Sequence, residues 1–135
     1  MKLKRIDHVG VIVDSLDRAR ELLENGFGLH SVRQLEREDL KASFFRCGNA
    51  EIELIEILDP AMREQRLGEG RAARVEHIAL EVEDLKAALA ALAGLGIETT
   101  GPPQVSPAYT TVWTQAETSG GVMYQILERP DSASS

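Results

Sequence analysis

The chain has 135 residues, of which 43% are apolar and 27% charged, a composition typical of a soluble globular protein and not of a disordered one. Lys and Arg number 15 against 22 Asp and Glu, and the net charge of −7 argues against a nucleic-acid-binding or membrane-binding surface. The single Cys47 excludes an internal disulfide, and without a signal peptide or a membrane-length apolar segment we expect a cytoplasmic protein.

The first half of the chain predicts a unit of β-α-β-β or β-α-β-β-β order. Its strands are indicated by apolar runs rich in β-branched residues. These runs are residues 5–13, 30–36, 40–47 and 51–58. After the first strand, Asp14 and Ser15 offer N-caps for a helix that continues to about residue 24. Asn25 and Gly26 then end this helix.

The second half of the chain repeats the first. Residues 7–16 read DHVGVIVDSL, and residues 76–85 read EHIALEVEDL. His8 and His77 therefore occupy matching positions, 69 residues apart, and the surrounding residues agree in type at nearly every position. A fixed offset of this kind is the signature of an internal repeat.

The match returns near the end of each half, where a glycine turn precedes an apolar run. The two segments read GNAEIELI at 48–55 and GGVMYQIL at 120–127. Glu53 matches Gln125 in this alignment, now 72 positions apart. The chain is thus predicted to hold two copies of one module.

The elements of the second copy follow the same order. We expect strands at 75–82, near 97–100, at 109–115 and at 121–128, with a helix from residue 84 to about 93. The predicted organisation is a single domain over 1–135, with module 1 at about 3–58, a connector at 59–74, module 2 at about 75–128 and a disordered tail at 129–135. The connector carries four arginines, which fit either a solvated linker or a site for an anionic substrate tail.

Strand alternation sorts the polar residues by face. The valines at 9, 11 and 13 form one apolar face, so His8 points to the other, and the same pattern holds for His77. On the last strand of each module, alternation places Glu53 and Gln125 on that same face. If the two copies pair about a pseudo-twofold axis, the four side chains converge. Two imidazoles and two oxygen ligands suit one divalent ion, Co, Ni, Mn, Fe or Zn, with positions left open for a substrate.

These motifs resemble the vicinal oxygen chelate superfamily, which includes glyoxalase I, bleomycin resistance proteins and extradiol dioxygenases, and within it they are most similar to methylmalonyl-CoA epimerases. The segments that carry the resemblance are DHVGV at 7–11, GNAEIEL at 48–54, GEG at 68–70, HIALEV at 77–82 and SGGV at 119–122. The resemblance implies an α+β fold in which two tandem βαβββ modules form a cupped mixed sheet. It also implies that His8, Glu53, His77 and Gln125 are metal ligands.

The activity implied by this resemblance is that of a divalent-metal-dependent epimerase or isomerase, which abstracts a proton next to a metal-polarised carbonyl. The expected partner is a small-molecule substrate such as an acyl-CoA, and dimers are common among such folds. The last ligand is usually Glu in the epimerases, and here it is Gln125. A neutral amide still coordinates through its oxygen, so Glu53 is the one charged ligand.

The general base is not marked by any motif. Candidates on the predicted strands are Glu51, Glu81, Lys41 and Tyr109, of which Glu51 and Glu81 share the alternation face of the ligands. Two other activities stay open on the same scaffold. One is a glyoxalase I-type lyase or a specialised-metabolism isomerase. The other is a metal-free protein of the resistance type that sequesters a small molecule.

Overall fold

The structure is a computed structural model that describes residues 1–130. It contains two compact units that do not coincide with the two halves of the sequence. One unit comprises residues 8–76, and the other combines residues 1–7 with the chain from residue 77 onward. The strands β1 (Leu3–Val13) and β5 (Ala73–Val82) therefore each contribute to both units. Within the described residues, no helix is long and apolar enough to span a bilayer.

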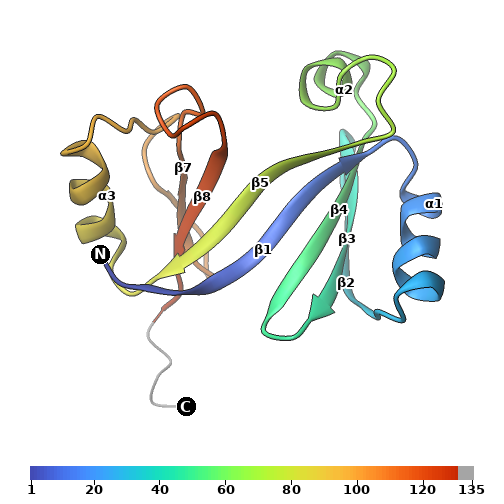
Figure 1. Cartoon of the computed structure of the whole chain (residues 1–135), viewed down its shortest axis with the longest axis horizontal. Coiled ribbons are helices and arrows are strands. Elements are labelled where there is room, and N and C mark those ends of the chain that lie inside the picture. Colours follow the sequence, from blue (N-terminus) through green and yellow to red (C-terminus); the bar gives the residue numbers. More distant parts are fainter. Residues whose placement is uncertain (131–135) are drawn as a thin grey trace. The chain divides into compact units, whose positions relative to one another are not determined.

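The unit of residues 8–76 contains the later part of β1 and the elements of the first module (Figure 1). These are α1 (Leu16–Glu21), a π-helical turn η1 (Leu22–Gly26), β2 (Ser31–Glu36), β3 (Leu40–Cys47), β4 (Ala50–Ile57) and α2 (Pro60–Arg66). The strand order is β2-β3-β4-β1. β4 runs parallel to β1, whereas the other neighbours are antiparallel.

The second unit has the same topology. After β5 come α3 (Leu85–Ala93), β6 (Gln104–Val105), β7 (Thr110–Trp113) and β8 (Met123–Glu128). The strand order is β5-β8-β7-β6, and β8 runs parallel to β5. The predicted α+β fold of two βαβββ modules, with a mixed sheet of eight strands, is confirmed.

The short strand β6 lies beyond its predicted position. Residues 97–100 contribute only a single bridge, between Thr99 and Thr114, and the ladder resumes at Gln104. Pro102 and Pro103 lie between these points, and a proline lacks the N–H that a ladder needs. The predicted helix of module 1 likewise ends in η1, where the N–H of Phe27 donates to the carbonyl of Leu22 in an i to i+5 bond.

The helices α1 and α3 are fixed at their starts in the same way. Ser15 and Asp84 are the N-caps, and their side chains accept from backbone N–H groups of the first turn. A glutamate on the last strand then accepts from the first helical N–H. Glu56 binds the N–H of Leu16 at 2.7 Å, and Glu128 binds that of Leu85 at 2.6 Å. A carboxylate also favours the positive end of a helix, so the last strand and the helix hold each other in place.

The helix side of each sheet is its apolar core. In the unit of residues 8–76, Leu16 and Leu23 pack against Phe45 and Leu54. In the second unit, the corresponding cluster consists of Val82, Leu85, Ala88, Val112 and Ile126. These clusters use the strand residues that alternate with the histidines, so the predicted apolar faces are confirmed. In the unit of residues 8–76, the opposite face carries His8 and Glu53 together with a second buried apolar cluster, which consists of Ile12, Leu40, Ala42, Phe44, Ile55, Ile57 and Leu67.

The Phe45 ring should be among the main contributors to stability, because it is 0% exposed at the centre of its cluster. We expect Phe45→Ala to lower the free energy of unfolding by about 3–5 kcal/mol, the usual cost of a large core cavity. Phe27→Ala is the matched control, since that ring is 69% exposed, and it should cost less than about 1 kcal/mol. Urea unfolding followed by circular dichroism measures both. Equal losses would contradict the assigned core.

Candidate functional site

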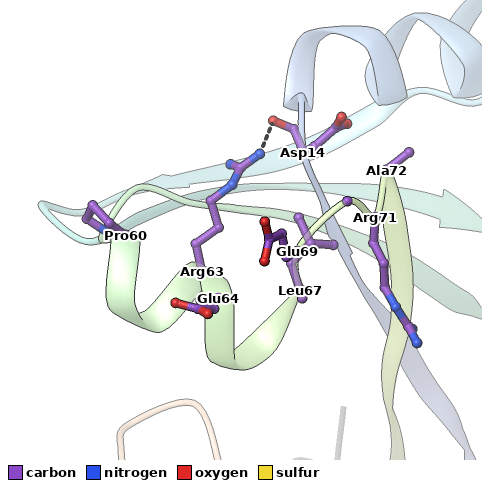
Figure 2. A pocket seen from close by; sticks show the side chains of 10 residues that line it. Asp14, Pro60, Arg63, Glu64, Leu67, Glu69, Arg71 and Ala72 are labelled. Atoms are coloured by element: carbon purple, nitrogen blue, oxygen red, sulfur yellow. Dashed lines mark hydrogen bonds between the residues drawn. The ribbon is translucent and has the colours of Figure 1, made fainter.

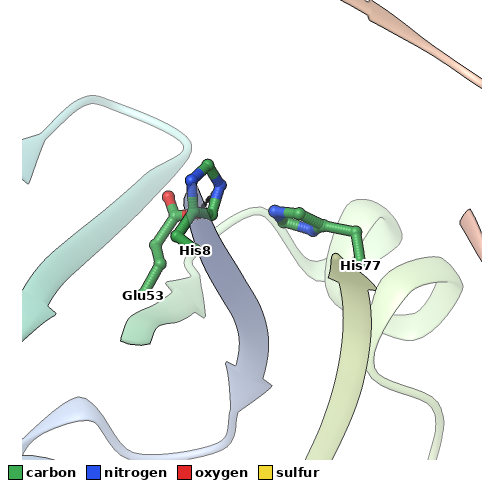
Figure 3. A group of neighbouring side chains, drawn as sticks. All are labelled: His8, Glu53 and His77. Atoms are coloured by element: carbon green, nitrogen blue, oxygen red, sulfur yellow. Dashed lines mark ion pairs between the residues drawn. The ribbon is translucent and has the colours of Figure 1, made fainter. Parts of the chain in front are cut away.

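In the unit of residues 8–76, His8 on β1 and Glu53 on β4 form a close pair. The parallel register places Glu53 opposite Gly10, two residues after His8 on the same face. Nε2 of His8 lies 3.4 Å from Oε1 of Glu53 (Figure 3). The two side chains are only 7% and 14% exposed. The sequence analysis predicted that both residues share a face, and the register brings them together.

In the second unit, His77 on β5 and Gln125 on β8 have the same relation in register. Gln125 lies opposite Ala79, again two residues after the histidine. His77 is 2% exposed and Gln125 is 3% exposed. The amide Nε2 of Gln125 donates to Oγ1 of Thr111 at 3.1 Å, and that hydroxyl donates to the carbonyl of Ile126. Because Nε2 is engaged as a donor, Oε1 is the ligand-type atom of this amide.

An aromatic ring accompanies each pair. Phe44 on β3 lies opposite Glu53, and its ring meets the His8 ring edge-on at 6.3 Å. Trp113 on β7 lies opposite Gln125, and its ring meets that of His77 edge-on at 4.8 Å. These contacts limit the rotation of the imidazoles.

These two rings are not among the residues predicted from the sequence. The signal was nevertheless present, because Phe44 and Trp113 lie 69 positions apart, the same offset as His8 and His77. Applying that offset to the third strand of each module would have found them. The rings act on the histidines rather than as ligands themselves.

The donor chemistry fits a divalent metal ion. Of the predicted ligands, His8 and His77 are buried and Glu53 is half-buried. Two imidazoles, a carboxylate and the amide oxygen of Gln125 are the ligand types that first-row divalent ions accept. The set contains no thiolate, which distinguishes it from the cysteine-rich sites of structural zinc.

Glu51, a candidate base, is a buried carboxylate held by two arginines. It is 7% exposed and lies on β4 opposite His8. Nη1 of Arg33 contacts one of its oxygens at 2.9 Å, and Nη2 of Arg46 contacts the other at 3.0 Å. A carboxylate that already binds two guanidinium groups can accept a proton from a substrate only at the expense of these ion pairs.

Glu81, the second candidate base, is held by cations of its own unit, which combines residues 1–7 with the chain after residue 76. It is 6% exposed, and Nε of Arg5 and Nη1 of Arg129 contact its Oε1 at 2.9 and 3.2 Å. Arg129 also binds Asp7 at 2.6 Å. Arg129 belongs to the segment predicted to be a disordered tail, but these contacts hold its side chain in place. Residues 131–135 of that tail lie outside the described residues.

The remaining candidates for the base are Lys41 and Tyr109. Lys41 alternates with Ala42 and Phe44 along β3, so it lies on the face that carries α1. Tyr109 is half-buried and precedes β7, and the guanidinium of Arg129 lies 5.8 Å from its ring centre. His30, expected at the surface, is exposed.

The connector forms a cavity of about 720 Å³, which Figure 2 shows with Asp14 and Arg63 among its lining residues. The guanidinium of Arg63 donates to the backbone carbonyls of Asp14 and Ile57, at 3.2 and 3.4 Å. Arg66 makes two 2.8 Å bonds to Glu76, and this hydrogen bonding raises the pKa of Arg66. These arginines therefore hold the connector in place, and none of the four predicted ligands lines the cavity.

Comparisons with known proteins agree with this architecture. The model of the Glyoxalase/Bleomycin resistance protein/Dioxygenase superfamily matches residues 7–112. YqjC of Bacillus subtilis, an uncharacterized protein, is 27% identical over 130 residues, which are 93% of each chain.

Solved structures with the same fold include methylmalonyl-CoA epimerases. The enzyme from Mycobacterium tuberculosis superposes with a TM-score of 0.81 at 22% identity, covering 98% of this chain and 93% of its own. A variant of the Streptomyces coelicolor enzyme, in complex with 2-nitronate-propionyl-CoA, gives 0.78 at 20% identity, covering 96% and 97%. At these identities the likeness shows the fold.

The hydroxyl of Thr111 should be needed to satisfy the buried Gln125 amide. Thr111→Val keeps the shape of the side chain but leaves Nε2 of Gln125 without this acceptor, so we expect a loss of about 1–3 kcal/mol in the free energy of unfolding. Thr110→Val is the control, because it removes a hydroxyl from the neighbouring, half-buried position. It should change the free energy of unfolding by less than about 0.5 kcal/mol. Thermal or urea unfolding of both variants checks this difference, which would vanish if the Thr111 bond were unimportant.

Proposed function

Because this chain belongs to the Glyoxalase/Bleomycin resistance protein/Dioxygenase superfamily, we propose that it is a divalent-metal-dependent epimerase or isomerase. In this proposal it moves a proton on the carbon next to a carbonyl group. The observation that carries the proposal is the repeated donor pair. In both modules, the first strand carries a histidine, and the residue two positions after it lies opposite an oxygen ligand on the last strand.

The proposed ligands are His8, Glu53, His77 and Gln125, acting together on one ion. Both histidines stand where the chain passes from one unit to the other, His8 directly after residue 7 and His77 directly after residue 76. A shared site requires the two pairs to meet. Its protein ligands would carry a single negative charge, from Glu53, so a bound divalent cation would keep a net positive charge.

A divalent cation in such a site supplies Lewis acidity to a carbonyl oxygen, which acidifies the adjacent C–H group. The residues of the chain have supporting roles. Phe44 and Trp113 hold the imidazole rings, and Thr111 orients the amide of Gln125. The low exposure of the donors keeps water away from the reacting atoms, which strengthens electrostatic interactions there.

The proposed substrate is a 2-substituted acyl thioester such as an acyl-CoA. Support comes from the fold shared with methylmalonyl-CoA epimerases, one of which was solved in complex with methylmalonyl-CoA and NH₄⁺. The proposal is tested by incubating the metal-loaded protein with chirally pure methylmalonyl-CoA in D₂O. Racemisation together with deuterium uptake at the 2-position is expected. Consumption of a hemithioacetal instead would identify a lyase of the glyoxalase I type.

Metal binding is the first prediction of this proposal. We expect about one Co, Ni, Mn or Zn ion per chain after loading, measured by elemental analysis and by calorimetric titration. His8→Ala and His77→Ala should each weaken binding at least 10-fold, because each removes an imidazole ligand. His30→Ala is the matched control, since His30 is exposed, and it should bind the metal as the parent does.

A parent protein that binds no metal under any loading would overturn the proposal and leave the metal-free binding function. Circular dichroism of each variant separates the loss of a ligand from the loss of the fold. Equal weakening by His30→Ala would show that the effect is not specific to the proposed ligands.

The general base is proposed among Glu51 and Glu81, and conservative substitution tests each one. Glu51→Gln or Glu81→Gln should lower kcat by at least 100-fold if that carboxylate transfers the proton, with little change in metal content. The measurement is deuterium uptake by the substrate in the metal-loaded variants. A residue whose substitution alters only KM acts in binding and not in proton transfer.

A further inference from the structure

A cluster of charged side chains lies beside His8 and belongs to module 1 alone. It is formed by Arg33 on β2, Arg46 on β3 and Glu51 on β4, all within the unit of residues 8–76. Glu51 is the residue opposite His8 in the parallel register. The cluster is therefore adjacent to the His8–Glu53 pair.

Arg33 is held on two sides and open on a third. Its Nη1 contacts Oε1 of Glu51 at 2.9 Å, and its guanidinium carbon lies 3.8 Å from the centre of the Phe44 ring. Phe44 is the ring that meets His8 edge-on. The side chain of Arg33 is nevertheless 50% exposed. Stacking on an aromatic ring fixes the plane of the guanidinium and leaves its outer N–H groups toward solvent.

Arg46 has a similar position on the neighbouring strand. It lies directly opposite Glu51 in the antiparallel register, and its Nη2 contacts Oε2 at 3.0 Å. Its side chain is 57% exposed. Each arginine therefore takes a different oxygen of the same carboxylate, and each offers five N–H donors.

The charge balance of the cluster is positive. Two guanidinium groups face one carboxylate, so a net charge of +1 stays at the open side of the cluster. This is unusual in a chain whose overall charge is −7. A fixed pair of guanidinium groups is suited to bind a carboxylate or a phosphate through paired hydrogen bonds.

Module 2 shows that the fold does not need these charges. The residue opposite His77, in the place that Glu51 occupies opposite His8, is Met123. The residue of module 2 that matches Arg46, 69 positions later, is the uncharged Gln115. Since a buried ion pair is often no more stabilising than apolar residues of similar volume, fold stability alone gives no reason for the cluster in module 1.

We infer that Arg33 and Arg46 bind an anionic group, a carboxylate or a phosphate, of the ligand that occupies the site beside His8. Glu51 contacts both guanidinium groups and therefore competes with that anionic group for their N–H donors. The inference deepens the proposed function by assigning residues to the recognition of a negatively charged group of the substrate, and it rests on that function only for the location of the substrate.

The test uses simple anions and the full chain without added metal. Titrations followed by ¹H–¹⁵N NMR give dissociation constants for malonate and inorganic phosphate, with neutral malonamide as the uncharged probe. The parent should bind at least one of the anions and not malonamide. Malonate alone would identify carboxylate recognition, and phosphate alone would identify phosphate recognition.

Substitutions assign this binding to the cluster. Arg33→Gln and Arg46→Gln should each weaken anion binding about 5- to 10-fold, because each removes charged hydrogen-bond donors. Glu51→Gln should strengthen it about 3- to 10-fold, because it removes the competing carboxylate. Arg37→Gln is the matched control, since Arg37 is 56% exposed and paired with Asp39, and it should bind as the parent does.

The inference is overturned if the parent and Glu51→Gln bind neither anion, or if the Arg33 and Arg46 variants bind as Arg37→Gln does. Arg33→Lys, which keeps the charge, replaces any arginine variant that unfolds, and it should retain part of the affinity. A different result is expected if the proposed epimerase activity is wrong and the anion site is right. Anion binding would then persist and depend on both arginines, whereas the metal-loaded protein would show no deuterium uptake.

Discussion

The parallel pairing between the first and last strand of each module determines the rest of the site. With Gly10 opposite Glu53 and Ala79 opposite Gln125, the histidine and the oxygen ligand of each module share one face of the sheet, two residues apart. A slip of one residue would move each side chain of the last strand to the other face of the sheet, so Glu53 and Gln125 would point to the helix side. The helix N-terminal contacts of Glu56 and Glu128 oppose such a slip, because both glutamates lie on those last strands.

Most of this arrangement could be predicted from the sequence, since it depends on local patterns. Alternation assigned His8 and Glu53 to one face, and the 69-residue offset extended the assignment to His77. Residues 1–7 belong to the compact unit of the second half of the chain, and this could not be predicted. It depends on which distant segments pair, and local periodicity contains no information about pairing partners. The ion pairs that hold Glu51 and Glu81 escaped prediction for the same reason, since Arg33 and Arg129 come from other strands or from the chain end.

The differences between the two modules are informative because their topology is the same. Phe45 fills the core of the first module, and 69 positions later stands Thr114, which lines a cavity of about 290 Å³ together with Leu80 and Tyr124. Opposite the two histidines stand Glu51 and Met123. One backbone plan thus accommodates a large aromatic or a small polar side chain at one buried position, and a charged or an apolar neighbour of the histidine. Where the backbone tolerates both, the side chain is selected by something other than folding.

The epimerases usually have a carboxylate at the position of Gln125. In this chain, the neighbouring side chain of Thr111 favours an amide there. While the single hydroxyl proton of Thr111 is donated to the carbonyl of Ile126, Thr111 accepts a hydrogen bond from position 125. An amide Nε2 supplies that donor, whereas a carboxylate would place an oxygen against the lone pairs of the hydroxyl. Thr111 therefore favours glutamine over glutamate. The neutral ligand follows from a hydrogen bond inside module 2, and it limits the charge of the proposed ligand set to that of Glu53.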